Sequence, residues 1–250
     1  MTQRREFLQQ AKTFLPEEHQ VHGWYLSEDI EGVRCFWDGG ISRYVATDKV
    51  PWASIKNPKT GERKIIKPFA SGLWSQYGNP IIAPDWFLDK LPPFACDGVI
   101  HGEAVADACA SHVPHSAFSG LQYSVWSSPT SHSFFQTGLV KNTSMDVQID
   151  YQACLRFMKK HAPDFESINK GATLEQELFM MRGWNGWDEQ VHIAPSIILP
   201  RKPLRAKAAV SIHAKRILDN GGTGMLIRYP HHTWVPKRVD YVLRFTVKVQ

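Results

Sequence analysis

The sequence predicts a single α+β domain built on antiparallel sheets. Short aromatic and β-branched runs, which are typical of strands, alternate with a few helical patterns along the 250 residues. One such region, residues 23–40, places two predicted strands on either side of a charged turn. Hydrophobic residues make up 43% of the chain and its mean hydropathy is -0.31, so a soluble globular protein with a sizeable core is expected.

The first elements expected are a short helix and a hairpin. Residues 4–14 place apolar side chains on one helical stripe that Pro16 ends, so residues 1–19 are expected to form a helical extension. Residues 23–40 are expected to form a hairpin, because Gly and Asp clusters bound its two strand-like runs. The predicted strands of the hairpin are 24–27 and 33–37.

The remaining elements are expected to complete one domain over residues 20–250, since no repeat or linker divides the chain. Residues 51–67 are rich in lysine and arginine and are broken by Asn57-Pro58, so an exposed loop is expected. Residues 70–89 contain a Gly-Leu-Trp-Ser run before a Pro-Asp-Trp turn and a short helix. Further strands are expected at 94–104, 121–126, 191–199, 224–229 and 239–249, and further helices at 151–160, 174–181 and 206–219.

The composition limits the classes of protein to which the chain can belong. No apolar run approaches the ~20 residues that span a membrane. The polar N-terminus lacks the apolar segment of a secretory signal, so the cytoplasm is the expected location. The four cysteines form no CxxC pair, which argues against a disulfide framework or a zinc ribbon. A net charge of +5 permits binding to a polyanion.

The run from Ser27 to Arg34 carries the most specific motif, and it reads Ser-Glu-Asp-Ile-Glu-Gly-Val-Arg. This run resembles the first motif of ATP-dependent DNA ligases of the compact phage and bacterial type, Ser-Glu-Lys-x-Asp-Gly-x-Arg. In that family the lysine attacks ATP to form a lysyl-AMP, and Asp29 stands at the lysine position here. The resemblance implies an ATP-grasp-like nucleotidyltransferase domain, in which antiparallel sheets flank a central groove. No OB-fold domain is expected, because the chain stops at Gln250.

Later runs resemble the remaining ligase motifs but lack their chemical groups. Three acids of the family are replaced by Val99, Ser127 and Thr223, and the two lysines of the last motif are Arg244 and Thr246. Carboxylates hold Mg²⁺ and the ribose in the family, and cations neutralise charge on the phosphates. Their joint loss indicates a domain that kept its shape without the ligation chemistry.

The resemblance also implies a set of groove residues. Asp29 stands at the catalytic position and is expected to be inactive, while Trp126 stands where a family aromatic stacks on adenine. ATP and Mg²⁺ are the cofactors that the family implies, although the lost acids argue against Mg²⁺, and no metal ligands are expected. A second interpretation is that the arginines pair with neighbours such as Glu31 or Asp97. The nucleotide- or phosphate-binding residues implied are Glu28, Glu31, Arg34, Trp126, Arg228, Arg238 and Arg244.

Three functions remain open on the sequence. The preferred one is a catalytically inactive, phage-encoded ligase-like protein that binds nucleotide or nicked DNA in the old groove. The second is a working ligase or AMP-transfer enzyme that uses unusual residues. The third is an interaction module that docks on a replication or virion protein.

A metal enzyme is a further alternative, because potential ligands gather within fifteen residues. His101-Gly102-Glu103 resembles the His-x-Glu of zinc deaminases, but their later Pro-Cys-x-x-Cys is missing. His112 and His115 have a zinc-like spacing, although Pro114 between them predicts a loop. These histidines are therefore interpreted as surface or structural residues.

Overall fold

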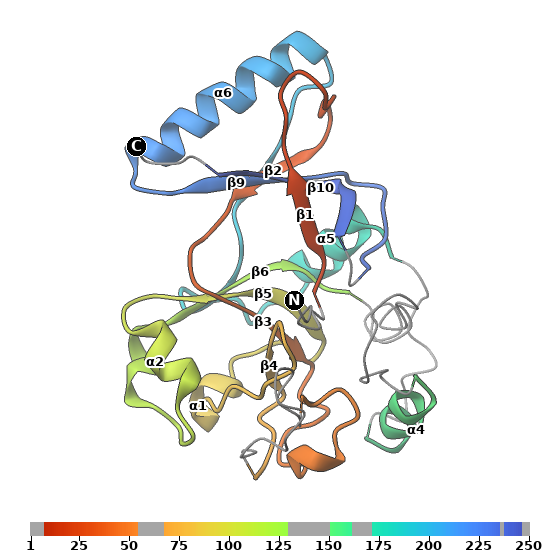
Figure 1. Ribbon diagram of the computed structural model, residues 1–250, viewed down its shortest axis with the longest axis vertical. Coiled ribbons are helices and arrows are strands. Elements are labelled where there is room, and N and C mark those ends of the chain that lie inside the picture. The colour runs from red at the N-terminus through yellow and green to blue at the C-terminus, as the bar shows by residue number, and fades with distance from the viewer. Residues whose placement is uncertain (1–7, 55–67, 130–150, 162–171, 236–237, 247–250) are drawn as a thin grey trace, which may run out of the picture.

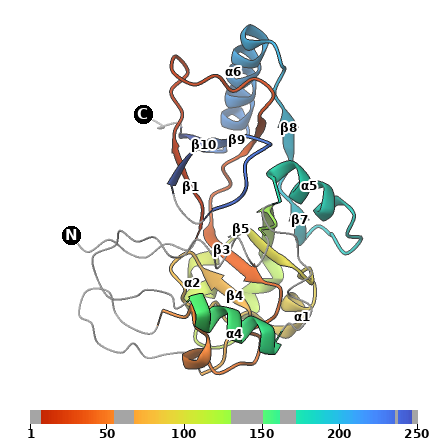
Figure 2. The same ribbon diagram turned by 90° about the vertical axis from the view of Figure 1, so that its right-hand side faces the viewer.

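The computed structural model describes residues 8–54, 68–129, 151–161, 172–235 and 238–246. Two five-stranded sheets lie one above the other in both views of Figures 1 and 2. We call the sheet beside the long helix α6 in Figure 1 the upper sheet, and the other the lower sheet. None of the helices in the described ranges has the length and apolarity to cross a lipid bilayer.

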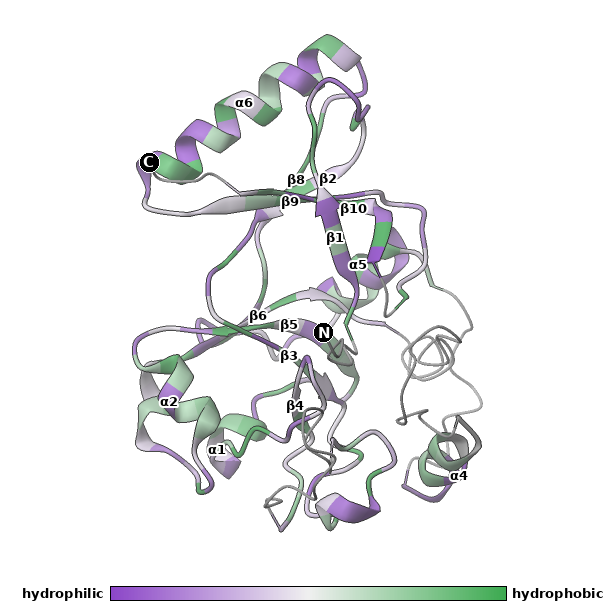
Figure 3. Cartoon of the chain, viewed as in Figure 1, coloured by the Kyte–Doolittle hydropathy of each residue, from purple (hydrophilic) through white to green (hydrophobic). Residues whose placement is uncertain are grey.

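The upper sheet has the strand order β1-β10-β9-β2-β8. Its apolar face packs against α6 (Pro203–Asp219), whose Ala206 and Val210 are buried against Leu26 and Ile227. Figure 3 shows hydrophilic and hydrophobic residues alternating along this helix, as expected for a helix with one face on a sheet. The strands are β1 (Gln10–Thr13), β2 (Tyr25–Glu28), β8 (Ser196–Ile198), β9 (Gly224–Arg228) and β10 (Arg238–Thr246).

The lower sheet has the order β4-β3-β5-β6-β7 and forms the largest apolar core, around Phe87, Phe118 and Tyr123. Its strands are β3 (Val33–Asp38), β4 (Leu73–Ser75), β5 (Ala95–His101), β6 (Gln122–Ser127) and β7 (Val191–Ile193). The other helical elements are η1 (Thr47–Lys49), α1 (Asp85–Leu88), α2 (Val105–Ala110), η2 (Ser116–Gly120), α4 (Tyr151–His161) and α5 (Leu174–Arg182).

Most of the predicted elements after residue 70 are confirmed. The helix at 174–181 begins with a capping box, in which the Thr173 side chain accepts from Gln176 N and the Gln176 side chain accepts from Thr173 N. The helix predicted at 206–219 starts three residues earlier, at Pro203, a residue that is favoured in the first helical turn. The short helix before residue 89, the helix at 151–160 and strands over most of 94–104, 121–126, 224–229 and 239–249 also form.

The hairpin predicted at 23–40 is wrong. Strand β2 pairs with β8 and β9 in the upper sheet, whereas β3 pairs with β4 and β5 in the lower sheet. Residues 29–32 therefore cross from one sheet to the other instead of turning back. The local signal for two strands and a break was correct, but long-range pairing decided their partners.

Two further predictions fail for the same reason. Residues 10–13, expected in a helix, form β1, which pairs in parallel with β10. The single strand predicted at 191–199 divides into β7 and β8, which belong to different sheets. The sheets are consequently mixed rather than purely antiparallel, since β6 and β7 also pair in parallel. Residues 55–67 of the predicted loop lie outside the described residues.

Candidate functional site

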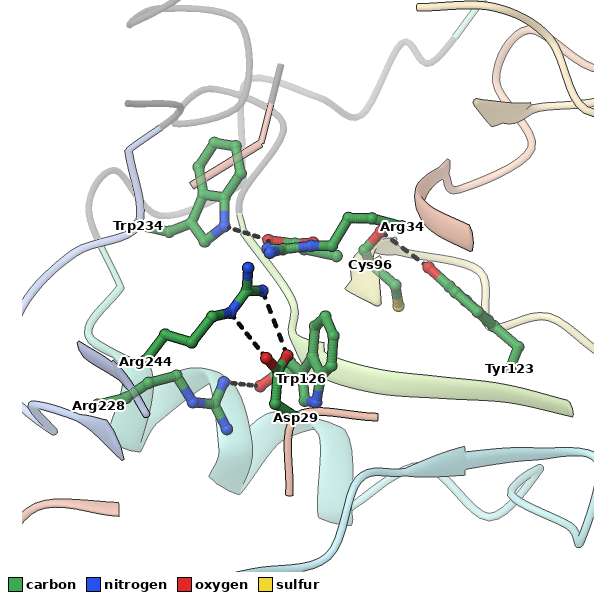
Figure 4. A network of polar contacts seen from close by, with 9 residues as sticks. Asp29, Arg34, Cys96, Tyr123, Trp126, Arg228, Trp234 and Arg244 are labelled. Carbon is green, nitrogen blue, oxygen red and sulfur yellow. Dashed lines mark hydrogen bonds and ion pairs between the residues drawn. The ribbon is translucent and has the colours of Figure 1, made fainter. Parts of the chain in front are cut away.

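The candidate site lies where residues 29–32 pass between the two sheets. Asp29 follows β2 directly, and its backbone N–H donates to the Gly224 carbonyl at 2.9 Å. Arg244 on β10 faces the Asp29 carboxylate with one edge of its guanidinium, so that two nitrogens contact two oxygens. Nε lies 2.7 Å from Oδ2 and Nη2 lies 3.2 Å from Oδ1 (Figure 4). Asp29, which the ligase resemblance places at the nucleophile position, thus forms a bidentate ion pair with Arg244.

The pKa of Asp29 is raised by burial, and the guanidinium groups of Arg244 and Arg34 oppose the rise. Its side chain is 16% exposed and that of Arg244 is 43% exposed. The carboxylate is therefore partly removed from water, and its charge is compensated mainly by the bound Arg244 and to a lesser extent by Arg34.

A second charged cluster surrounds Asp97 on β5. Arg34 on β3 donates to Asp97 through Nε (3.1 Å to Oδ1) and Nη2 (3.0 Å to Oδ1 and 2.8 Å to Oδ2), and Trp234 Nε1 donates to Oδ2 at 2.9 Å. The antiparallel register places Arg34 opposite Val99, so its side chain reaches diagonally to Asp97 on the same face. Asp97 is buried, and both of its carboxylate oxygens accept hydrogen bonds from these two neighbours.

Trp126, which the ligase resemblance places at the adenine-stacking position, is buried in the protein. Trp126 is 3% exposed and packs with Val99, Ala194 and Leu226 in an apolar cluster that joins the two sheets. The Arg34 guanidinium carbon lies 4.8 Å from the centroid of the Trp126 ring, which is a cation–π contact. Trp126 is consequently a packed core residue here and not an open platform for a base.

A buried pair of ionisable groups lies beside this cluster. Arg228 donates through Nη1 to the Trp126 carbonyl, while its Nε and Nη2 have no hydrogen-bond partner among the described residues. Burial lowers the pKa of Arg228 to about 10, although Asp97 and Glu177 act to raise it. Burial raises the pKa of Glu177, on α5, to about 8, although Arg228 acts to lower it. A cavity of about 10 Å³ lined in part by these two residues is at the lower limit of the room that one water needs.

The structure brings together five of the residues predicted from the sequence and separates the others. Glu28 and Glu31 are exposed, and Glu28 Oε1 lies against Gly222. Arg238 is exposed at the start of β10, six residues from Arg244, a separation of about 20 Å along a strand. The five that gather are Asp29, Arg34, Trp126, Arg228 and Arg244.

Sequence reasoning missed Glu177 and Trp234. Glu177 occupies a stripe of α5 shared with Leu174, Leu178 and Met181, all of which are buried. A single acid on an apolar helical stripe was a usable signal of a buried charge. Trp234 offered no comparable signal, because its contact with Asp97 spans 137 positions of the chain.

The side chains present do not fit the Mg²⁺ chemistry that the ligase resemblance implies. Val99 is 1% exposed within the apolar cluster, and Ser127 and Thr223 carry no carboxylate. Across the described ranges, no three or more His, Cys, Asp or Glu side chains are grouped to hold a metal ion, and this includes the histidines of residues 101–115.

No protein-family model and no curated protein matches the sequence. Solved structures do match. A Lig E DNA ligase structure is 14% identical with a TM-score of 0.59, and the alignment covers 96% of this chain and 68% of that one. A structure described as Pmar-Lig_Pre is 9% identical with a TM-score of 0.57, covering 97% of this chain and 47% of that one. The fold is that of a DNA ligase.

The two solved structures match this chain over nearly its whole length but at low sequence identity. The DNA-ligase fold covers nearly all of this chain, but the chain spans about two thirds of the Lig E structure and less than half of the Pmar-Lig_Pre structure. At 14% identity or less, the likeness establishes the ligase fold and its two-sheet α+β architecture, and function must be argued from the side chains.

Proposed function

We propose that this chain is a non-adenylating, ligase-like protein that binds DNA. The observation that carries the proposal is the ion pair between Asp29 and Arg244, with Nε and Oδ2 2.7 Å apart at the ligase nucleophile position. A carboxylate held by a guanidinium is a poor nucleophile, and it repels the anionic triphosphate that it would have to attack. An AMP-transfer reaction through this residue is therefore disfavoured.

The filled groove supports the same conclusion. Val99, Trp126 and Leu226 occupy the space between the sheets and are each at most 3% exposed. Entry of an adenine ring would require these side chains to separate and would expose apolar surface to water, which costs free energy. Arg34 is also engaged by Asp97, so it is not free to bind a phosphate. ATP is consequently not a substrate in this proposal.

The outer face of α6 is the proposed DNA surface. Among the described residues, Lys207 is the only residue of this helix in an ion pair, which it forms with Glu17. Exposed cations at its start and along its length can meet phosphates, which supply most of the sequence-independent affinity for DNA. The similar Lig E structure is described as binding DNA with a minimal scaffold, and the net charge of +5 agrees with such a role here. The exposed cations are Arg201, Lys202, Arg205, Lys215 and Arg216.

The adenylation half of the proposal is tested with ATP labelled on the α-phosphate. The parent protein, Asp29→Lys and Asp29→Asn are incubated with label and Mg²⁺ and run on a denaturing gel, with a lysine-dependent ligase as the positive control. No labelled band is expected on any of the three. A band on the parent overturns the proposal, whereas a band on Asp29→Lys alone shows that the groove opens to ATP and that Asp29 is the block.

The DNA half is tested by fluorescence anisotropy with intact and nicked duplexes at several salt concentrations. Arg205→Gln combined with Arg216→Gln is expected to reduce the slope of log affinity against log salt by about 2, because each phosphate contact contributes about 0.9. The matched control, Lys49→Gln with Arg182→Gln, removes the same charge from exposed residues elsewhere. Equal losses in both variants would assign binding to overall charge, and absence of binding would favour the interaction module.

A further inference from the structure

Two imidazoles converge on one hydroxyl in the lower sheet. His101 Nε2 lies 2.9 Å from Ser124 Oγ, and His192 Nε2 lies 2.8 Å from the same oxygen. The three residues come from the neighbouring strands β5, β6 and β7, and Ser124 stands directly opposite His192 in the register. The two rings are nearly perpendicular, at 85°, with centroids 6.2 Å apart.

This trio lies on the face of the lower sheet that points toward the upper sheet. Ser124 is opposite Val99 in the register, and Trp126 follows two residues later on the same strand face. Val99 and Trp126 pack against Leu226 of the upper sheet, so the trio shares their side of the lower sheet. Ser124 is buried and both histidines are half-buried.

The number of hydrogen-bond donors that the trio can offer to a ligand depends on the protonation of its two imidazoles. A serine has one proton and two lone pairs, so it donates to one neutral imidazole and accepts from the other. When both imidazoles are protonated, both Nε2–H groups donate to Oγ, and the serine proton must point elsewhere. Neither Nδ1 has a hydrogen-bond partner among the described residues. The doubly protonated trio therefore offers two free Nδ1–H donors and two positive charges, while the buried Ser124 hydroxyl joins the two rings.

These three side chains suit an anionic ligand better than a metal ion. Zinc sites use three or four protein ligands, whereas no third His, Cys, Asp or Glu joins these two histidines among the described residues. Charge-assisted hydrogen bonds from imidazolium groups suit a phosphate oxygen. We propose that His101, Ser124 and His192 form a proton-linked binding site for a phosphate monoester, supplied either by a free nucleotide or by a DNA 5′ end.

The electrostatic surroundings agree with this assignment. The pKa of His101 is lowered by burial and by repulsion from His192, and no carboxylate contributes. Gln122 and Ser124 on β6 and Gly32 in the crossing segment, which lie beside His101, are uncharged. A bound phosphate would supply the missing negative charge. The site rests on sheet residues and stands independently of the proposed DNA surface on α6.

The first test uses the unmodified protein, so it does not depend on the folding of a variant. Histidine resonances are followed by NMR through a pH titration with and without inorganic phosphate. Phosphate is expected to shift the resonances of His101 and His192 and to leave those of the exposed His112 unchanged. No shift, or an equal shift at His112, overturns the site even if the protein binds DNA through α6.

The second test identifies the source of the phosphate. A 5′-phosphorylated oligonucleotide, its 5′-hydroxyl counterpart and thymidine 5′-monophosphate are compared at several pH values from about 5 to 7, because the pKa of His101 is lowered. His192→Gln and Ser124→Ala are expected to remove the preference for the phosphorylated ligand, a loss of about tenfold, whereas His112→Gln should retain it. Preference for the phosphorylated oligonucleotide identifies a DNA end, and binding of the monophosphate alone identifies a free nucleotide. Retention of the preference in His192→Gln overturns the proposal.

Discussion

Arg244 Nε lies 2.7 Å from Asp29 Oδ2, and this pair joins the first motif to the last across 215 positions of the chain. By the ligase resemblance both positions would carry lysines, and two cations at this distance would repel. This chain has an acid at one position and a base at the other, which attract instead. The ion pair connects β10 to the crossing segment.

We predict that Arg244→Ala destabilises the protein by about 1–2 kcal/mol, because it leaves the partly buried Asp29 carboxylate without its main cation. The pKa of Asp29 should rise further in this variant, since Arg244 is the largest influence that lowers it. Urea unfolding measures the free energy, and Arg238→Ala on the same strand should change it by less than about 0.5 kcal/mol. Adding Asp29→Asn should restore part of the loss. If the double variant is as unstable as the sum of the two single variants, the pair is not coupled.

A larger loss is predicted at Asp97, which is 2% exposed and accepts from both Arg34 and Trp234. Asp97→Ala leaves a buried guanidinium edge and an indole N–H without partners, so about 3–5 kcal/mol should be lost. Chemical denaturation checks the value. Asp240→Ala is the control, because the Asp240 side chain is 76% exposed and meets only Lys12 at 3.9 Å. A similar small effect at both positions would mean that the Asp97 cluster does not hold β3 and β5 to residue 234.

Trp126 gives a test of whether the groove is filled or open. A packed tryptophan that is 3% exposed should cost about 3–5 kcal/mol when it is replaced by alanine, through lost burial and the cavity left behind. Trp86→Ala removes the same side chain where it is 45% exposed and should cost much less. Thermal and urea unfolding report both variants. If Trp126→Ala is as stable as the parent but binds nucleotide more weakly, Trp126 is a base platform and the closed groove is wrong.

The local elements could be predicted from the sequence, but their partners could not. Gly and Asp clusters predicted a break after Ser27, one residue before β2 ends at Glu28. The same signal fits both a turn that returns to its own strand and a segment that crosses to another sheet. The strand predicted at 191–199 divides at Ala194 and Pro195, where proline lacks the N–H that a continuous strand would use. Pairing with β10 decides the conformation of residues 10–13, and that strand lies more than two hundred residues away.

The candidate site could likewise be predicted only in part: several of its residues could be named from the sequence, but their contacts could not. The motif frame identified Asp29, Arg34 and Arg244, because a short motif fixes residues that share one segment or one strand. It could not show that Arg244 turns to Asp29, since that contact depends on how β10 lies beside the crossing segment. The convergence of His101 and His192 was equally hidden, because three strands from separate parts of the chain must pair before both rings reach Ser124.

The last prediction concerns Glu177, whose pKa is raised from 4.5 to about 8 by burial. Because the folded protein holds a proton that the unfolded chain releases above about pH 4.5, folding is coupled to proton uptake between these two values. The contribution of this residue to stability is therefore full below pH 4.5, declines as pH rises, and is constant again above about pH 8. Arg228, with a pKa of about 10, does not titrate in this window.

Glu177→Gln cannot ionise and should escape this decline. We expect the variant to match the parent near pH 5 and to exceed its stability at pH 8.5 by about 2–5 kcal/mol, because glutamine fits the site without a buried charge. Urea unfolding at several pH values measures the difference, which also removes the contribution of Asp38, a buried acid with a pKa of about 6 present in both proteins. Glu175→Gln, on the exposed side of the same helix turn, is the control and should follow the parent at every pH. A variant that loses stability at pH 8.5 would show instead that the ionised Glu177 is held by Arg228, and that their attraction exceeds the cost of burying both charges.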